Sequence, residues 1–287
     1  MTANAGPDPA YDPALDPALE TARERARAAL RRHSPELADL PLEALGSGLD
    51  HIAFQAGDLV LRISDDQHNL AEARLLRLVG PRLSVAIPVP VFGDDAEGVL
   101  AYQKLPGRSL LGHPPLPGSA AVLGRFLGEL HCLPTGEFST LVTMDSADPD
   151  EWLDDLDGPA ELIAVVRSGV PEPGSALDCV LVHGDLGAEH LLHDGSQLTG
   201  VIDWADSVVS DPELDFARLY RDFGPAFLDD VLAAYRRHPG TGPIDLDRVE
   251  FFARCAALED LAYGIRTGRR EYQDAAERSL TWLFPDA

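Results

Sequence analysis

The sequence predicts an α+β protein that is divided into two lobes. Alternation of apolar and polar residues, which is typical of strands, lies within residues 42–105, and helical spacing begins at Ser119. The 287 residues are too many for one small domain and suit lobes of roughly 100 and 180 residues. With 45% hydrophobic residues the chain can bury a core. We therefore expect a small antiparallel sheet with one helix, followed by a larger and mainly helical part.

Acidic residues outnumber basic ones by a wide margin. The chain has 48 Asp and Glu residues against 23 Lys and Arg residues, which gives a formal net charge of −25. Nucleic acids and anionic membranes bind protein surfaces that are rich in Lys and Arg. The strongly negative net charge therefore argues against both as partners. A small cationic substrate fits better, although acidity also raises solubility by itself.

The start of the chain has no basic region followed by an apolar run, and no later apolar run reaches about 18 residues. We expect a cytoplasmic protein that is a monomer or a homodimer. Three cysteines are odd in number and widely separated within apolar sequence, which predicts buried free thiols in a reducing compartment: Cys132, Cys179 and Cys255.

Residues 1–16 repeat Asp-Pro-Ala and hold little apolar surface, so we expect a disordered or loosely extended acidic leader. Asp16-Pro17 then supplies an N-cap acid and a first-turn proline, and the helix is expected to end near His33, before Ser34-Pro35. The small sheet and its one helix follow from Leu42, where the segment 45–51 is expected to join the first two strands. The later elements are expected at 58–63 (strand), 68–79 (helix), 87–92 (strand) and 98–103 (strand).

The second lobe begins with a helix from Ser119 that ends at Leu133-Pro134, followed by an acidic loop over residues 136–160 that Trp152 anchors. Two buried strands and five further helices are expected: strands 180–182 and 198–204, and helices 161–167, 216–223, 226–237, 246–268 and 271–284. In the long helix one apolar stripe is predicted to be core, and the other face to be exposed. The core stripe is Phe251, Phe252, Leu258, Leu261 and Ile265, and the exposed residues are Glu259, Asp260 and Tyr263.

The densest potential chemistry lies between Cys179 and Phe216. His183-Gly184-Asp185 follows the first of the two strands, and Asp203 lies near the end of the second. A carboxylate that follows a buried strand, after a glycine that allows a sharp turn, can be partly desolvated and aimed at a reacting group. The hard anionic oxygens of the second carboxylate suit Mg²⁺ beside nucleotide phosphates. Together the two acids predict one base and one metal anchor.

The motifs of this stretch resemble those of the antibiotic phosphotransferases, the aminoglycoside and macrolide kinases, which share the protein-kinase fold. The matching residues are His-Gly-Asp at 183–185, His190, Ile-Asp-Trp at 202–204 and Asp-Pro-x-x-Asp-Phe at 211–216. The resemblance implies a bilobal kinase-like fold in which Asp185 is the catalytic base and His190 and Asp203 bind Mg²⁺. It also implies a structural role in the catalytic loop for four residues: His183, Gly184, Asp211 and Asp215. A histidine at position 190 is similar to the macrolide branch in particular.

The first lobe supplies the candidate nucleotide site. In a kinase fold a strand lysine meets the phosphates and pairs with a helix glutamate, and here Arg62 and Glu72 occupy those positions. Ser47 and Gly48 lie in a glycine-containing turn whose amides could approach a phosphate. Further contacts are expected from the segment that reads the base in kinases: Tyr102, Gln103 and Lys104. These assignments imply a leader at 1–16, an N-lobe at 17–103, a hinge at 104–110 and a C-lobe at 111–287.

The sequence thus predicts a phosphotransferase that moves the terminal phosphate of ATP or GTP to a hydroxyl of a small cationic molecule. The resemblance implies an antibiotic acceptor of macrolide or aminoglycoside type, and resistance or self-protection as its purpose. Acidic and aromatic candidates for the acceptor site are Asp206, Glu259, Asp260 and Tyr263. Alternatives stay open: a degenerate kinase fold that only binds nucleotide, a His/Asp dinuclear metal hydrolase, or another acceptor such as a basic peptide antibiotic or a metabolite.

Overall fold

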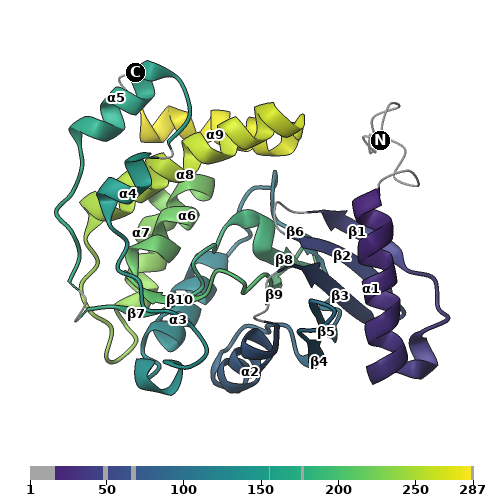
Figure 1. The fold of residues 1–287 in the computed structure, drawn as a ribbon. Coiled ribbons are helices and arrows are strands. Elements are labelled where there is room, and N and C mark those ends of the chain that lie inside the picture. The colour runs from purple at the N-terminus through teal and green to yellow at the C-terminus, as the bar shows by residue number, and fades with distance from the viewer. Residues whose placement is uncertain (1–16, 48–50, 66–68, 155, 176–177, 286–287) are drawn as a thin grey trace. The chain divides into compact units, whose positions relative to one another are not determined.

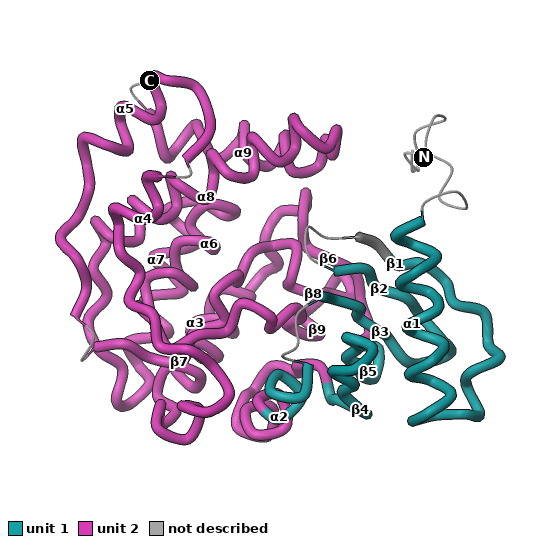
Figure 2. Tube along the Cα trace, viewed as in Figure 1, with its two compact units in different colours: residues 1–74, 89–104 teal, residues 75–88, 105–287 magenta. Residues whose placement is uncertain are grey.

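The computed structural model describes residues 17–47, 51–65, 69–154, 156–175 and 178–285, and it confirms the α+β class (Figure 1). The predicted leader and Gly48 lie outside the described residues. The chain divides into two compact units, residues 1–74 with 89–104 and residues 75–88 with 105–287 (Figure 2). One boundary between the units falls within helix α2 (Asn69–Val79).

Unit 1 contains an antiparallel sheet of five strands in the order β1-β2-β3-β5-β4. Its strands are β1 (Glu43–Ser47), β2 (His51–Ala56), β3 (Leu59–Ser64), β4 (Pro90–Asp94) and β5 (Val99–Gln103). The fourth strand begins three residues later than predicted, at Pro90 in place of Ile87. Proline has no amide hydrogen to donate to a ladder, which suits its place at the start of an edge strand.

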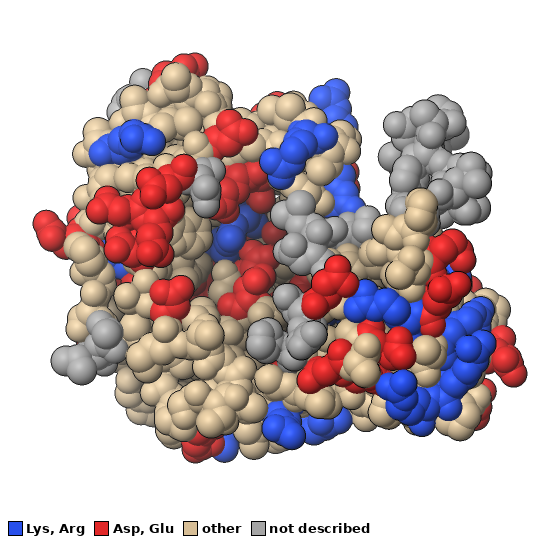
Figure 3. All heavy atoms as spheres, in the orientation of Figure 1, with Lys and Arg blue, Asp and Glu red and all other residues tan. Residues whose placement is uncertain are grey.

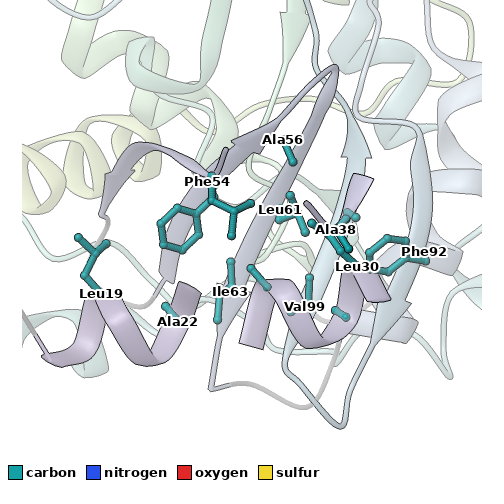
Figure 4. Packing of buried hydrophobic residues seen from close by; sticks show 14 residues of the cluster. Leu19, Ala22, Leu30, Ala38, Phe54, Ala56, Leu61, Ile63, Phe92 and Val99 are labelled. Atoms are coloured by element: carbon teal, nitrogen blue, oxygen red, sulfur yellow. The ribbon is translucent and has the colours of Figure 1, made fainter. Parts of the chain in front are cut away.

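Helix α1 (Pro17–His33) packs on this sheet with the bounds that the sequence predicts (Figure 4). Its proline at the first position needs no hydrogen-bond acceptor, and Pro35 beyond its end cannot continue it. Small buried residues, Ala22, Ala26 and Ala29, let the helix approach the strands closely. They meet fully buried residues of the sheet such as Phe54 and Leu61, so this contact is a continuous apolar core.

Unit 2 is mainly helical. Its helices are α3 (Ser119–His131), α4 (Pro149–Asp154), α5 (Ala160–Ser168), α6 (Glu213–Phe223), α7 (Pro225–Tyr235), α8 (Leu246–Thr267) and α9 (Arg270–Leu283). Two small antiparallel sheets carry the central motifs, β10 with β7 and β6 with β8 and β9. Their strands are β6 (Arg108–Ser109), β7 (Val180–Val182), β8 (Leu191–His193), β9 (Leu198–Val201) and β10 (Val208–Ser210). Helices α6, α8 and α9 share a core that includes Leu214, Phe252 and Leu283.

Three expectations for unit 2 are corrected. The segment 136–160 is not only loop, because Pro149–Asp154 forms α4, where Trp152 packs on Phe252 with ring centroids 5.1 Å apart. Ile265 is 63% exposed and does not belong to the core. The cysteines are free as expected, but Cys132 and Cys179 are half-buried and only Cys255 is buried.

Acidic side chains are prominent on the surface of unit 2. Figure 3 shows a group of Asp and Glu side chains over the part of unit 2 that carries α4, where three acids are exposed: Asp150, Glu151 and Asp154. Throughout the described ranges, each helix is too short or too polar to cross a bilayer.

Candidate active site

The loop after β7 holds the first predicted acid, Asp185. The preceding residue, Gly184, has a φ of 86°, which a side chain rarely allows. A Cβ atom at this position would also lie 2.3 Å from the carbonyl oxygen of Asp206. Glycine is therefore required twice, by the backbone angle and by the close approach of the turn that contains Asp206.

Asp215 fixes the backbone of this loop from the first turn of α6. The N–H groups of His183 and Gly184 donate to its two carboxylate oxygens over 3.1 and 3.0 Å, and His131 Nε2 lies 3.0 Å from one of them. Asp215 is 0% exposed, and both histidines are buried beside it. Charge-assisted bonds to a buried carboxylate are strong, so Asp215 holds residues 183–184 firmly.

His183 is a neutral and structural member of the loop. Its Nδ1 accepts from the N–H of Asp185 over 3.3 Å, so its Nε2 carries the proton that is donated to the carbonyl of Ile202 over 3.0 Å. Burial lowers the pKa of this imidazole and keeps it uncharged. The side chain thereby ties the Asp185 loop to the chain just before Asp203.

His190 lies between the two predicted acids. Its Nε2 is 3.5 Å from Asp203 Oδ2, and its Nδ1 is 3.5 Å from Asp185 Oδ2. The same Nδ1 donates to the backbone carbonyl of Asp185 over 2.8 Å, which sets the ring orientation. Burial opposes a charge on His190, but the carboxylates of Asp185, Glu189 and Asp203 outweigh it and raise its pKa.

Asp203 adopts a backbone conformation that is uncommon for residues with a Cβ atom. Its φ is 63°, and it is the one non-glycine residue with positive φ in the part of the chain that the structure describes. Left-handed backbone costs an L-residue on the order of 1–2 kcal/mol, and such strain is frequent at functional positions. The turn directs the Asp203 carboxylate to the same side as His190.

Helix α6 presents a row of charged residues to this loop. Arg218 Nε lies 3.2 Å from Asp185 Oδ1, and Arg221 Nη2 lies 3.1 Å from both carboxylate oxygens of Glu189. Asp222 accepts from the N–H of Ala188 over 2.6 Å. Burial opposes charge on Asp185, but Arg218, His190 and Arg221 outweigh it and lower its pKa to about 2. The base candidate is therefore ionised.

The acceptor candidates fall into two groups. Asp206 and Glu259 are exposed, whereas Asp260 is not on an exposed face as predicted, because its side chain is 15% exposed and lies 3.0 Å from Arg221 Nη1. Tyr263 is half-buried and meets Tyr272 edge to face at 5.1 Å. Although Asp206 is exposed, the protein around its carboxyl group reduces the hydration of that group, and this effect together with the carboxylates of Asp185 and Asp203 raises the pKa of Asp206.

In unit 1 the predicted nucleotide residues Arg62 and Glu72 form a buried ion pair. Ser47 is the last residue of β1. The N–H groups of Gln103 and Lys104 donate to the carbonyls of Val89 and Asp58, over 3.2 and 2.9 Å, so these two groups are not free to meet a base. The Lys104 ammonium donates to the side chain of Gln55 over 2.6 Å, and Tyr102 is half-buried.

The model of the phosphotransferase enzyme family (APH) matches residues 41–252 of the chain. The chain belongs to this family. Viomycin phosphotransferase of Streptomyces vinaceus is 28% identical to it over 224 residues, which cover 69% of this chain and 76% of that protein. The chain is therefore a phosphotransferase enzyme with relatives among the antibiotic kinases. This result decides against the dinuclear metal hydrolase, the alternative that the histidines had left open.

Solved structures of this family have the same fold. The complex of APH(2″)-IIIa with GDP and kanamycin has a TM-score of 0.70 and 23% identity, and it covers 91% of this chain and 98% of that one. The macrolide 2′-phosphotransferase MphH of Brachybacterium faecium, an apoenzyme, has a TM-score of 0.62 and 23% identity, with coverage of 90% and 97%. The likeness confirms the predicted kinase-like fold of this phosphotransferase.

Asp211, the other acid of the Asp-Pro-x-x-Asp segment, lies away from the row on α6. It is buried in an ion pair with Arg248 of α8. The same guanidinium donates to the carbonyls of Glu172 and Ala147 over 2.6 and 3.1 Å. In this phosphotransferase the pair joins the chain before β7, the loop before α4 and the start of α8.

The donor set at the predicted metal site fits a divalent cation. Asp203 supplies a carboxylate oxygen of the kind that Mg²⁺ prefers. Because Nδ1 of His190 is committed to a backbone carbonyl, a neutral ring would present its Nε2 lone pair on the Asp203 side. A second set that could hold a metal is Asp185, Glu189 and His190, whose donor atoms lie within 4.8 Å of one another.

Four residues that surround the loop of the candidate site were not predicted: Glu189, Arg218, Arg221 and Asp222. A signal for the last three was present, because Asp215, Arg218 and Asp222 recur at positions i, i+3 and i+7 of one helix, with Arg221 beside Asp222. Those positions share one helix face, and three polar groups on a face that begins with a buried Asp indicate a polar partner.

Proposed function

We propose that this phosphotransferase moves the terminal phosphoryl group of a nucleoside triphosphate, ATP or GTP, to a hydroxyl of a small cationic antibiotic. The observation that carries the proposal is the grouping of Asp185, His190 and Asp203, in which His190 lies 3.5 Å from a carboxylate oxygen of each acid. One carboxylate is suited to a hydroxyl and the other to a cation. Bound Mg²⁺ would supply charge neutralisation of the phosphate oxygens.

The roles of the protein's own residues follow from their environments. Asp185 is ionised at neutral pH and half-buried, so it orients the acceptor hydroxyl and takes up its proton as the new bond to phosphorus forms. His190 and Asp203 would hold the magnesium ion. Arg62, which Glu72 fixes, would bind phosphate oxygens with its fork of donors.

Nucleotide contacts in unit 1 remain part of this proposal. Ser47 and Gly48 would place backbone amides beside the phosphates. Because the N–H groups of Gln103 and Lys104 are bound within unit 1, we propose that residues 102–104 contact the base through carbonyl oxygens or side chains. Relatives have been solved with GDP and, in the case of APH(2″)-IIa, with ATP and streptomycin, so both nucleotides belong in the assay.

The acceptor class is proposed from charge. Asp206 and Glu259 are exposed carboxylates in a protein of net charge −25, which favours an acceptor with amino or guanidino groups. Aminoglycosides, macrolides with an amino sugar and basic peptides such as viomycin, the substrate named for one relative, all meet this requirement. Modification of such a compound would give resistance or self-protection.

The test is a transfer assay with a panel of acceptors. The wild type is incubated with MgCl₂, ATP or GTP, and viomycin, kanamycin, streptomycin or a macrolide, and mass spectrometry detects the addition of one phosphoryl group. Asp185→Asn should lower the rate by about 10²–10⁴-fold. Asp229→Asn, an exposed acid on α7, is the matched control and should retain the rate. Transfer at full rate by Asp185→Asn would remove Asp185 from the reaction, and no transfer to any acceptor would favour a protein that only binds nucleotide.

A further inference from the structure

Arg218 is the residue of α6 that touches the proposed base directly. Its Nε lies 3.2 Å from Asp185 Oδ1, and its Nη1 lies 3.7 Å from Glu259 Oε2 on α8. The Asp185 side chain is 24% exposed, against 46% for Glu259. The shorter contact, to the less exposed acid, is the stronger of the two, because exposed ion pairs contribute little.

The two oxygens of the Asp185 carboxylate have different surroundings. Oδ1 faces the guanidinium of Arg218, whereas Oδ2 faces Nδ1 of His190 at 3.5 Å. The His190 nitrogen makes its shorter contact, 2.8 Å, with the backbone carbonyl of Asp185 and not with the carboxylate. Arg218 is therefore the closest charged group that the structure gives to the carboxylate itself, and it engages one oxygen.

The loop backbone is already fixed without Arg218. Asp215 accepts the N–H groups of His183 and Gly184, and His183 accepts the N–H of Asp185. These bonds fix the position of the Asp185 Cα but leave rotation about the two side-chain bonds of Asp185 unconstrained. A reacting group that is misplaced by about 1 Å can lose on the order of 10² in rate. A guanidinium bound to Oδ1 limits that rotation.

We propose that Arg218 is a positioning residue for phosphoryl transfer, which holds Oδ1 of Asp185 so that Oδ2 meets the acceptor hydroxyl. This inference rests on the proposed function. In the step the hydroxyl oxygen forms a bond to the terminal phosphorus, its proton passes to Oδ2, and the bond from that phosphorus to the leaving oxygen of the nucleotide breaks. The bonding electrons leave with the nucleoside diphosphate, and Asp185 later returns the proton to solvent. Arg218 keeps its charge and its proton throughout.

Two other roles would place Arg218 in the same location. It could serve only as a structural link between α6 and α8 through Glu259, or it could meet the phosphoryl group without acting through Asp185. If Arg218 is only a structural link, Glu259→Gln and Arg218→Met should lower kcat by the same factor. Action apart from Asp185 predicts that Arg218→Met lowers the rate equally whether or not Asp185 is present.

The experiment measures kcat and KM for six proteins with the panel acceptor that the wild type phosphorylates, viomycin first. The six are the wild type, Arg218→Met, Arg218→Lys, Glu259→Gln, Asp185→Asn and the double variant Asp185→Asn with Arg218→Met. We expect Arg218→Met to lower kcat about 10–100-fold with nucleotide KM within about twofold, and Arg218→Lys to recover part of the loss. In the Asp185→Asn background the same change should alter the residual kcat by less than about twofold.

Each other outcome has a defined meaning. An Arg218→Met variant with wild-type kcat overturns the inference, and so does an equal loss of kcat when Arg218→Met is added to Asp185→Asn. An equal loss of kcat in Glu259→Gln at saturating acceptor also overturns it, because weaker acceptor binding by that variant would raise KM and leave kcat unchanged. Thermal unfolding of every variant checks the fold, and Arg218→Lys decides the question if Arg218→Met does not fold. If the inference alone fails, the wild type is still active and Asp185→Asn is still about 10²–10⁴-fold slower. A wild type that transfers phosphate to no acceptor overturns the proposed function and the inference with it.

Discussion

Helices α1 and α6 each hold an important element of their own unit, but they do so by opposite means. In unit 1, α1 covers the sheet through buried apolar side chains (Figure 4). In unit 2, α6 holds the loop 183–190 through bonds to carboxylates and guanidinium groups. Apolar burial has no preferred direction, whereas ion pairs and hydrogen bonds depend on angle and distance. The comparison indicates that α1 mainly supplies stability and α6 mainly supplies geometry.

The charges around α6 are not balanced. Arg221 is 1% exposed and lies within 3.1 Å of carboxylate oxygens from three residues: Glu189, Asp222 and Asp260. Burial of three carboxylates with one guanidinium lowers the free energy of unfolding, because each ion loses its hydration. Burial raises the pKa of Asp222, and burial together with Glu189 and Asp222 raises that of Asp260 to about 7 against the effect of Arg221 and Arg218. The loop of unit 2 is thus held at a cost in stability.

The largest effect on stability is expected in the apolar region. Phe54 is 0% exposed between the sheet and α1, so Phe54→Ala should lower the free energy of unfolding by about 3–5 kcal/mol, through lost burial and the cavity that remains. At a temperature where the variant is fully folded its kcat should equal that of the wild type. Urea unfolding and the transfer assay measure the two quantities.

Phe54→Leu is the matched control, which keeps most of the volume and should lose about 1.5 kcal/mol or less. The contrast between the two helices would break down if fully folded Phe54→Ala lost as much kcat as Arg218→Met. It would also break down if Arg218→Met cost as much stability as Phe54→Ala.

The sequence was a good guide to the apolar region and a partial guide to the rest of the fold. The bounds of α1 follow from a proline at its start and another beyond its end, and alternation predicted β3 to within one residue. The predicted joining segment 45–51 was too long, because residues 45–47 belong to β1 and β2 begins at His51. Short elements such as α4 and β8 carry no pattern long enough to predict them. Ile265 continues the apolar stripe of α8 but lies in its last turn, since a periodic stripe does not tell where the neighbouring helix stops covering it.

The site shows a different limit. Motifs at 183–185 and 202–204 indicated Asp185 and Asp203, and the structure places His190 within 3.5 Å of each. Arg218 was overlooked because a charged residue on a helix is most often solvated, and only its spacing from Asp215 distinguishes it. Asp260 was predicted to be exposed, since nothing local in α8 indicates that Arg221 lies opposite. The sequence therefore did not predict contacts between residues that are far apart along the chain, such as Arg221 with Asp260.

A smaller effect, dependent on pH, should reveal the unbalanced charge around α6. The pKa of Asp260 is raised to about 7, above that of the unfolded chain, so its protonated form favours folding at low pH and this stability is lost as pH rises through 7. The asparagine of Asp260→Asn does not titrate, so this variant does not lose that stability as the pH rises. Relative to the wild type, the variant should gain roughly 2–3 kcal/mol of unfolding free energy between pH 5 and pH 8. Urea unfolding at both pH values measures the gain.

Glu259→Gln, on the neighbouring and exposed position of α8, is the control and should show no such gain. An Asp260→Asn variant whose stability relative to the wild type is the same at pH 5 and pH 8 would mean that Arg221 fully compensates its acids. The region around α6 would then be as free of electrostatic cost as the apolar region around α1.

The smallest effect concerns the backbone at Asp203, whose φ of 63° suits glycine better than any residue with a Cβ. Asp203→Gly should therefore be about 1 kcal/mol more stable than Asp203→Ala in urea unfolding, while both lose activity with the carboxylate. Ala205→Gly, two residues later and without a positive φ, is the control and should lose stability, because glycine gives the unfolded chain more freedom. If Asp203→Gly is no more stable than Asp203→Ala, the turn at Asp203 holds no strain. The loss of stability that accompanies the site of unit 2 would then come from its buried charges alone.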